Sequence, residues 1–368
     1  MIRSGVLYLA TDAYGGRGGI ALYNRDVIDA MLRLPDLAPL KVIPRIAGNG
    51  AHAVPADIDW RAQAGKSPSH FVAECARAAL QRPKPALIYC AHVNLLPFAA
   101  ALKLATGAPL LLAIYGIEAW KPFRRTSSRR ALSAVDHLLS ISRYTADEFC
   151  KWSGWQPENV SIVPNAIRLE DFGPGPRHPN LERRYGLEGR KAVLLFGRMD
   201  SSERRKGFDE LLEAWPAIRD QRPATRLLLA GDGGDIHRLQ AKAKDLGIAE
   251  EVVFTGFMPE SEKADLYRLA DAYVMPSTQE GFGFVHLEAM ASGVPAVASK
   301  RDGAREAVRG GLIGALVDPF DRDEIIRETL KALDRPKSVP AGLAYFAFDG
   351  FVERLEACVR QTLSGRAG

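Results

Sequence analysis

The sequence has few cysteines and no long apolar run. Its four cysteines are scattered, and no two of them form a C-x-x-C pair. This spacing disfavours a zinc site and a disulfide framework, and it fits a reducing cytoplasm. A membrane-spanning helix needs about 18–20 consecutive apolar residues, and none is present, so none is expected. The apolar run near the N-terminus is also too short to predict a signal peptide. The cysteines are Cys75, Cys90, Cys150 and Cys358.

The charge is unevenly distributed along the 368 residues. Residues 1–170 hold 20 Lys and Arg against 13 Asp and Glu, a net charge of +7. Residues 171–368 hold 29 against 31, a net charge of −2. A basic first half beside a nearly neutral second half indicates that the first half meets an anionic partner.

Short apolar runs alternate with helical patterns through both halves of the chain. That alternation predicts an α/β protein with two doubly wound parallel sheets, and the length suits two domains. A stretch rich in glycine, proline and charge predicts a linker at 171–190. The expected domains are therefore 1–170 and 191–345, followed by an amphipathic helix at 346–368.

The stretch Tyr273–Ser299 reads as strand, loop, helix, turn and strand, with the helix expected at Phe284–Ala291. Gly281 and Gly283 lie in its loop, where glycine lets the backbone approach a ligand closely. The helix that follows directs free N–H groups and a positive dipole end toward the loop, an arrangement that suits a diphosphate. Glu280 lies in the loop and Glu288 one turn inside the helix, so one carboxylate can meet sugar hydroxyls and the other a ribose.

The residues E-G-F-G-F-V-H-L-E-A-M-A-S-G-V-P-A-V-A-S resemble the E-x7-E motif of retaining glycosyltransferases of the group 1, or family-four, type. The resemblance implies the GT-B architecture, in which two Rossmann-like domains face each other across a cleft. The first domain would bind the acceptor and the second the nucleotide sugar, and the last helix would cross back onto the first domain. His286 stands where the family usually has an apolar residue, and we expect it to be a helix-face residue.

The resemblance also assigns roles in the second domain. A strand ending in G-R, followed by K-G before a helix, makes Arg198 and Lys206 the cations that neutralise a departing nucleoside diphosphate. Glu280 completes the implied catalytic set, and Glu288 would hold the ribose. The backbone of T-G-F-M-P would face the base. The other implied donor-binding residues are Phe257, Phe282, Gly283, Phe284 and Val285 in the second domain, together with Gly18 and Gly19 in the first.

In the first domain, the strand Leu110–Ile114 ends at Tyr115. The family typically has His-Gly at this strand end, and that histidine helps to hold the transferred sugar. A phenol can donate a hydrogen bond to a sugar hydroxyl, but it cannot act as a base near neutral pH without a large pKa shift. His92 and Glu118 are the other candidates for contact with the acceptor or sugar, and a structural role for His92 stays open.

The segment from Lys121 to Arg130 carries five positive charges and no acidic residue. It is either a solvated surface loop or a patch for an anionic membrane surface or a lipid-pyrophosphate acceptor. Nucleic acid is not expected as a partner, because no aromatic residues that could stack on bases are interleaved with the arginines. The patch consists of Arg124, Arg125, Arg129 and Arg130.

The sequence therefore predicts a retaining glycosyltransferase that moves a hexose from a GDP- or UDP-linked sugar to a hydroxyl of a glycan or lipid-linked acceptor. No metal is expected, because side chains supply the cations, and no cofactor beyond the nucleotide-sugar co-substrate is expected. The expected location is cytoplasmic, with peripheral attachment to the inner face of the membrane if the basic patch meets lipid. Two alternatives remain: a sugar-nucleotide epimerase on the same layout, and a non-catalytic nucleotide-sugar-binding homologue.

Overall fold

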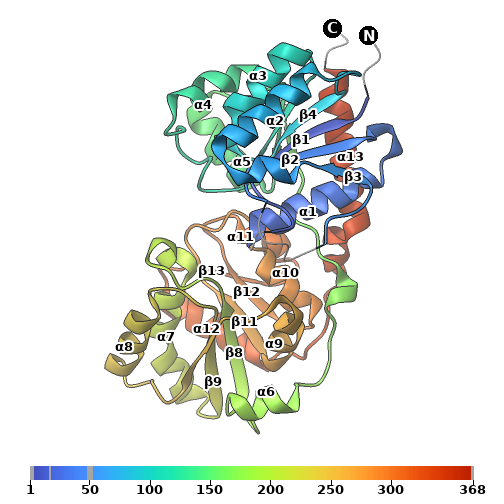
Figure 1. Ribbon diagram of the computed structural model, residues 1–368. Coiled ribbons are helices and arrows are strands. Elements are labelled where there is room, and N and C mark those ends of the chain that lie inside the picture. The colour runs from blue at the N-terminus through green and yellow to red at the C-terminus, as the bar shows by residue number, and fades with distance from the viewer. Residues whose placement is uncertain (1–3, 16–17, 48–52, 366–368) are drawn as a thin grey trace. The chain divides into compact units, whose positions relative to one another are not determined.

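The computed structural model describes residues 4–15, 18–47 and 53–365, and it divides the chain into two compact units. Unit 1 comprises residues 1–166 together with 348–368, and unit 2 comprises residues 167–347. In Figure 1, unit 1 runs from the blue to the green elements and includes the red C-terminal helix, and unit 2 runs from light green to orange.

Unit 1 is built on a seven-stranded sheet in the order β3-β2-β1-β4-β5-β6-β7. All neighbouring strands are parallel, and β1 lies between β2 and β4, so that Val6 pairs with both Leu40 and Leu87. Parallel strands covered on both faces read as continuous apolar runs, as Val6–Ala10, Leu87–Cys90 and Leu110–Ile114 do. The strands are β1 (Val6–Ala10), β2 (Leu40–Pro44), β3 (Ile58–Trp60), β4 (Leu87–Cys90), β5 (Leu110–Ile114), β6 (His137–Ser140) and β7 (Val160–Ile162).

The helices of unit 1 form two groups that pack on the sheet (Figure 1). One group includes α2 and α3, which contact each other, and the other pairs α1 with α13. The Phe351 ring of α13 meets the Tyr23 ring of α1 edge-on at 5.5 Å. The helices are α1 (Gly19–Leu32), α2 (Pro68–Leu80), α3 (Leu96–Thr106), α4 (Thr126–Ala131), α5 (Arg143–Ser153) and α13 (Phe348–Ser364).

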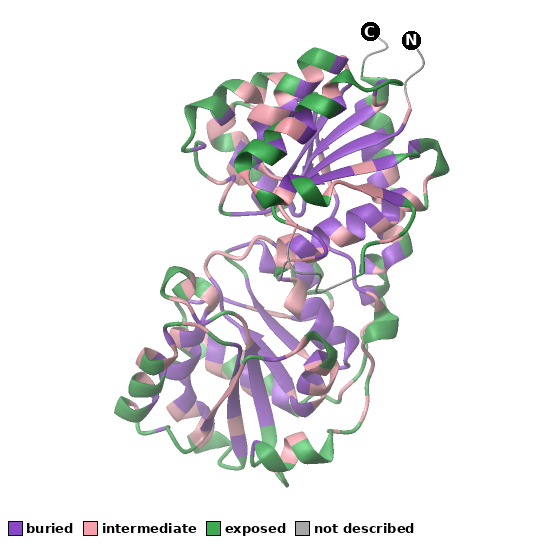
Figure 2. Cartoon of the chain, viewed as in Figure 1, coloured by how far each residue is buried: buried purple, intermediate pink, exposed green. Residues whose placement is uncertain are grey.

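Unit 2 repeats this topology with six parallel strands in the order β10-β9-β8-β11-β12-β13. Its strands β11 and β12 are buried along their whole length, and β8 is buried except at its two ends, as the purple arrows of Figure 2 show. The strands are β8 (Lys191–Phe196), β9 (Thr225–Ala230), β10 (Val252–Gly256), β11 (Ala272–Met275), β12 (Ala296–Ser299) and β13 (Ala315–Val317). The helices are α6 (Pro179–Arg184), α7 (Phe208–Gln221), α8 (Ile236–Asp245), α9 (Lys263–Leu269), α10 (Phe284–Ala291), α11 (Ala304–Ala307) and α12 (Arg322–Asp334).

The strand order determines where a ligand can bind in each unit. In an open parallel sheet, ligands bind beyond the carboxyl ends of the strands, at the point where the strand order reverses. That point falls between β1 and β4 in unit 1 and between β8 and β11 in unit 2. The loops that follow β8 and β11 carry the predicted residues Arg198, Lys206 and Glu280.

The predicted linker, 171–190, lies inside unit 2, and this boundary is a correction. Tyr185 and Leu187 are buried in the core of unit 2, with 7% and 0% of their surface exposed. Arg177 donates to Asp271 Oδ2 and to the backbone carbonyl oxygens of Leu187 and Arg190. The glycines and prolines of this stretch therefore form turns that fold it onto the second core, and the chain passes between the units near residues 166–167 and 347–348.

Candidate functional site

The loop between β11 and α10 places Glu280 at the carboxyl end of the sheet of unit 2. It ends at Gly283, which caps α10 with φ 81° and ψ 55°, a left-handed conformation that glycine adopts readily. A Cβ atom on Gly283 would also lie 2.8 Å from His286 Nδ1 and 3.2 Å from Glu280 Cγ. Both the backbone conformation and the space therefore require glycine at this position.

Glu280 forms an ion pair with Lys206, a contact that the sequence analysis did not predict. The Lys206 Nζ–Glu280 Oε2 distance is 3.3 Å, and the charge of Glu280 raises the pKa of Lys206. Lys206 Nζ also lies 3.4 Å from Glu203 Oε2, and Arg198 lies 3.1 Å from Glu203 Oε1. The structure thus connects the three predicted catalytic residues through Glu203, which the sequence analysis missed. The available signal was its position three residues before Lys206.

The loops after β8 and β11 are also locked together through their backbones. Thr278 N–H donates to the carbonyl oxygen of Arg205 at 2.9 Å. Gly207, with φ 89°, packs so closely that an added Cβ would lie 2.7 Å from the Pro276 carbonyl oxygen. The glycine of the K-G pair therefore brings Lys206 against the loop that carries Glu280.

Glu288 is buried, and its carboxylate already has two protein partners. Tyr267 donates to Oε2 at 2.6 Å, and Lys263 Nζ lies 3.2 Å from Oε1. Burial raises the pKa of Glu288, while Lys263 opposes that shift. Only 3% of the surface of Glu288 is exposed, so a ribose would have to share the carboxylate with Tyr267 and Lys263. Neither partner was anticipated from the sequence.

Asp302, after the neighbouring strand β12, contacts the same loop and was not predicted as a site residue. Its Oδ2 accepts hydrogen bonds from the Ser277 hydroxyl and from Glu280 N–H, both at 2.8 Å. Its Oδ1 accepts from Ala304 N–H at 3.0 Å. Asp302 is 0% exposed, and burial raises its pKa to about 7 against the opposing effect of these donors.

The predicted donor-binding side chains near α10 and after β10 differ in how far they are buried. The Phe282 side chain is 1% exposed and packs on the Phe346 ring at 5.6 Å, so its predicted contact with a donor is corrected to a core position. Phe284 and Val285 are half-buried at the start of α10, and Phe257 is 50% exposed after β10. His286 is fully buried, with Nδ1 2.9 Å from the Gly283 carbonyl oxygen. It therefore supports the start of α10 from inside the core.

In unit 1, the predicted phenol is directed into a buried network. The Tyr115 hydroxyl donates to Asn24 Oδ1 at 3.1 Å, and the Tyr8 hydroxyl donates to the same oxygen at 2.8 Å. Tyr115 is 6% exposed, and burial raises its pKa well above the ordinary value. Its proton is thus already donated within the unit, which contradicts the expectation that it is offered to a sugar.

The other candidates of unit 1 have local structural roles, as acceptors for backbone N–H groups of nearby loop residues or at the start of α1. Glu118 Oε1 accepts from Tyr115 N–H at 2.6 Å and from Gly116 N–H at 3.1 Å. His92 Nδ1 accepts from Asn94 N–H at 3.1 Å, and burial lowers the pKa of His92. Gly18 caps α1 with φ 101°, and Gly19 is the first residue of that helix. Gly18 therefore adopts a left-handed φ, whereas Gly19 is helical.

The four arginines of the predicted patch are exposed on α4 and the residues before it. Arg129 Nε donates to the Phe123 carbonyl oxygen at 2.6 Å, which fixes that guanidinium above the loop. Across residues 4–15, 18–47 and 53–365, no helix is long and apolar enough to cross a membrane. The same residues contain no cluster of three or more His, Cys, Asp or Glu side chains that could hold a metal ion.

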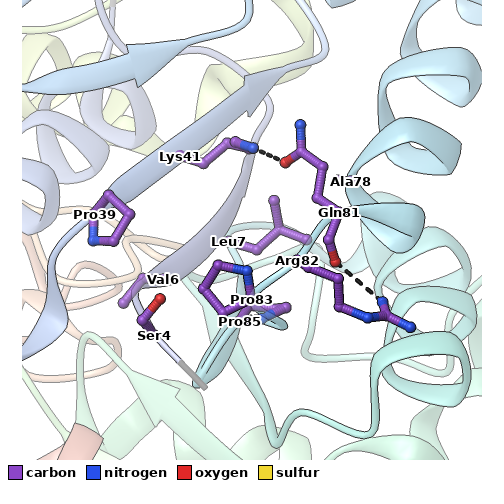
Figure 3. Close-up of a pocket in the computed structure, with 10 residues that line it drawn as sticks. All are labelled: Ser4, Val6, Leu7, Pro39, Lys41, Ala78, Gln81, Arg82, Pro83 and Pro85. Carbon is purple, nitrogen blue, oxygen red and sulfur yellow. Dashed lines mark hydrogen bonds between the residues drawn. The ribbon is translucent and has the colours of Figure 1, made fainter. Parts of the chain in front are cut away.

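A hollow of about 150 Å³ lies in unit 1 at the amino ends of the strands, the end of the sheet away from Tyr115 (Figure 3). Its wall is mainly hydrocarbon, with the Lys41 ammonium group hydrogen-bonded to the Gln81 side chain on one side. No predicted site residue lines it.

Two family models match this chain. The model described as glycosyl transferases group 1 matches residues 179–341, and the model described as glycosyltransferase family 4 matches residues 35–171. The chain belongs to the group 1 glycosyltransferases. The two matches fall on units 2 and 1, so the family layout of two Rossmann-like domains, expected from the sequence, is confirmed.

Relatives of this group 1 chain include two curated glycosyltransferases. A Mycolicibacterium smegmatis GDP-mannose-dependent alpha-(1-6)-phosphatidylinositol monomannoside mannosyltransferase is 35% identical over 257 residues, 67% of this chain and 66% of the relative. A Catenulispora acidiphila D-inositol 3-phosphate glycosyltransferase 1 is 36% identical over 264 residues, 67% of this chain and 62% of the relative. The matched region thus spans just under two thirds of these relatives.

Solved structures share the fold over nearly the whole chain. Anabaena HepE in complex with UDP has a TM-score of 0.75 at 20% identity, covering 97% of this chain and 100% of that chain. WaaG, a glycosyltransferase involved in lipopolysaccharide biosynthesis, has a TM-score of 0.66 at 17% identity, covering 99% of this chain and 100% of that chain. At these identities the likeness shows the fold alone.

Proposed function

We propose that this chain transfers a hexose from a nucleoside diphosphate sugar to a hydroxyl of a glycan or lipid-linked acceptor, with retention of configuration. The observation that carries the proposal is the Lys206–Glu280 ion pair where the strand order of unit 2 reverses, next to the N-terminus of α10. The curated relatives are named for GDP-mannose and inositol-containing acceptors, which supports GDP-mannose as the first donor to test.

The roles follow from charge and position. Arg198 and Lys206 would stabilise the negative charge that grows on the departing diphosphate, because preorganised cations act where charge develops in the transition state. The N–H groups at the start of α10 would bind phosphate oxygens. Glu280 would accept hydrogen bonds from sugar hydroxyls. As the family resemblance implies, the donor phosphate would take the proton of the acceptor hydroxyl, so no protein nucleophile is assigned.

The same residues favour a reaction that needs no metal, since Arg198 and Lys206 already bring two cations to the site. Attachment to an anionic surface through the four arginines of α4 and the preceding residues is part of the proposal, as is a cytoplasmic location. Both rest on the exposed basic segment and the cysteine pattern.

A ligand screen followed by a transfer assay tests the proposal. A donor at 100 times its Kd stabilises the folded state by about 2.7 kcal/mol, so GDP-mannose and UDP-glucose should be separable by thermal shift. The stabilising donor is then incubated with acceptor, with and without EDTA, and we expect equal transfer. Loss of transfer with EDTA, restored by Mg²⁺, would refute the metal-independent mechanism. Donor conversion without acceptor would indicate an epimerase, and binding without transfer or hydrolysis a non-catalytic homologue.

A further inference from the structure

Asp302 lies outside the E-x7-E motif, yet it contacts the loop that presents the first glutamate of that motif. We propose that Asp302 is a positioning residue, which holds the backbone at Glu280 so that the Glu280 carboxylate reaches the transferred sugar. This inference rests on the proposed function of Glu280. It adds to the site a residue that follows β12, the strand next to β11 in the sheet.

The Asp302 carboxylate bridges three backbone segments. Oδ2 accepts from Ser277, where the loop begins, and from Glu280 N–H, both at 2.8 Å. Oδ1 accepts from Ala304 N–H at the start of α11, at 3.0 Å. Because Asp302 is fully buried, each of these hydrogen bonds is shielded from water, and losing one would leave a buried donor unsatisfied.

Gly303 adds a backbone hydrogen bond to the same loop, and Asp302 and Gly303 together are called the clamp. Gly303 N–H donates to the Glu280 carbonyl oxygen at 2.9 Å, so residues 302 and 303 hold both polar backbone groups of Glu280. A Cβ atom on Gly303 would lie 2.1 Å from the Gly281 carbonyl oxygen. Its φ of −64° is ordinary, so close approach of the loop, and not backbone conformation, requires glycine here.

The clamp acts on the sugar-holding carboxylate more than on the nucleotide-holding part of the site. Glu280 lies in a loop, whereas Glu288 lies inside α10 and is held by Tyr267 and Lys263. A displacement of about 1 Å in a positioned group can lower the rate by about 10²-fold. Loosening the clamp should therefore slow transfer while leaving nucleotide binding nearly intact.

Asp302→Asn tests whether transfer can be slowed without weakening nucleotide binding. The Asn side chain replaces one carboxylate oxygen, a hydrogen-bond acceptor, with an NH₂ group that can only donate. We expect kcat for transfer from GDP-mannose to fall about 10- to 100-fold, while the Kd of GDP stays within about threefold. UDP-glucose and UDP replace this pair if the donor screen selects uridine. Gly303→Ala should reproduce the separation by pushing Gly281 away, and it decides the question if Asp302→Asn does not fold.

Matched variants separate a positioning role from a loss of folding. Gly234→Ala is the control for Gly303→Ala, because no atom lies within 4 Å of its added Cβ, and it should behave like the unaltered protein. Ser277→Ala removes one donor to Asp302 and should lower kcat less than Asp302→Asn does. Unchanged kcat in both Asp302→Asn and Gly303→Ala, or a parallel loss of GDP affinity, would overturn the inference.

Glu280→Gln distinguishes failure of this inference from failure of the proposed function. If Glu280→Gln leaves kcat unchanged, the proposed role of Glu280 is wrong. If Glu280→Gln lowers kcat while Asp302→Asn and Gly303→Ala do not, only the positioning role is wrong.

Discussion

The two units share a strand order but place different chemistry at the ends of their central strands. In unit 2, the loops after β8 and β11 place Lys206 Nζ within 3.4 Å of both the Glu203 and the Glu280 carboxylates, in a chain of ion pairs. In unit 1, neutral groups meet instead: the hydroxyls of Tyr8 and Tyr115 share Asn24 Oδ1. The same topology can therefore place either charged or neutral side chains at the ends of its central strands.

The placement of charge explains this difference. Burial raises the pKa of Tyr8, Tyr89 and Tyr115 well above the ordinary value, so these phenols stay neutral and act as fixed dipoles. Unit 1 carries a group of exposed arginines on α4 and the residues before it. In unit 2, Arg198 and Lys206 lie at the ends of the central strands, in the candidate site. The comparison thus predicts that unit 2 binds the diphosphate of the donor and that the arginines of unit 1 bind an anionic surface.

The largest expected effect concerns the exposed charge of unit 1. Each arginine near an anionic membrane contributes about 1 kcal/mol, screened within a Debye length. Changing Arg124, Arg125, Arg129 and Arg130 to Ser should weaken binding to phosphatidylserine vesicles by about 10³-fold in co-sedimentation, with little change in turnover of a short water-soluble acceptor.

A matched variant of unit 2 carries the same charge change on four exposed arginines, Arg183, Arg184, Arg322 and Arg335. It should bind vesicles like the unaltered protein. Equal binding by the two quadruple variants would exclude the patch as the membrane contact, and poor turnover of the soluble acceptor by the first would place its arginines at the acceptor instead.

The next largest effect is on chemistry in unit 2. Lys206→Met removes a cation from the proposed diphosphate site, and loss of one such preorganised group typically lowers kcat by about 10²–10³-fold. Single-turnover transfer at saturating donor measures the effect. The control is Lys244→Met, an exposed lysine on α8, and equal rates for both variants would remove Lys206 from the catalytic set.

A buried histidine should make the stability of unit 2 depend on pH. Burial lowers the pKa of His286 to about 4, against about 6.5 in an unfolded chain. This contribution to stability is fully present above pH 6.5. As the pH falls toward 4, the unfolded state takes up a proton that the folded state does not, and about 2–3 kcal/mol is lost.

His286→Gln should reduce the change in the free energy of unfolding between pH 7.5 and 4.5, measured by urea unfolding at each pH. His137 in unit 1 has its pKa lowered by burial as well, without a large shift, so His137→Gln should reduce it less. The same slope in His286→Gln and in the unaltered protein would show that His286 does not control the acid sensitivity.

Glu288→Gln should weaken donor binding by about 1.5–3 kcal/mol, since it weakens a hydrogen bond to a charged group, and kcat at saturation should change little. The substitution also disturbs the buried contacts with Lys263 and Tyr267, so unfolding must be measured beside the donor Kd. A lower melting temperature with an unchanged Kd would make Glu288 a structural residue only.

The smallest effect is expected for Tyr115→Phe in unit 1. It removes one of two hydrogen bonds to Asn24, a loss of about 1 kcal/mol in stability, and should change kcat by less than about threefold. Tyr8→Phe removes the other bond and serves as the control. A tenfold lower kcat in Tyr115→Phe alone would indicate that the Tyr115 hydroxyl acts on a substrate, and the contrast between the units would then fail.

The sequence by itself determined the α/β alternation and the family, because these depend on local patterns. The short continuous apolar runs of β8 and β11 are typical of buried parallel strands. The E-x7-E stretch predicted α10 at Phe284–Ala291, with the bounds that the structure has. The pairing of G-R with K-G likewise identified Lys206, which lies against Glu280.

Only the tertiary structure decided which partners surround those residues. Asp302 follows β12, 22 residues after Glu280, and they meet because β11 and β12 are adjacent in the sheet. Tyr115 reaches Asn24 across 91 residues, because the fold places the residue after β5 against α1, where its ring meets the Tyr23 ring edge-on at 5.4 Å. The hydrogen bonds of a buried polar group are satisfied by whichever groups the fold brings near, and spacing along the chain does not contain that information.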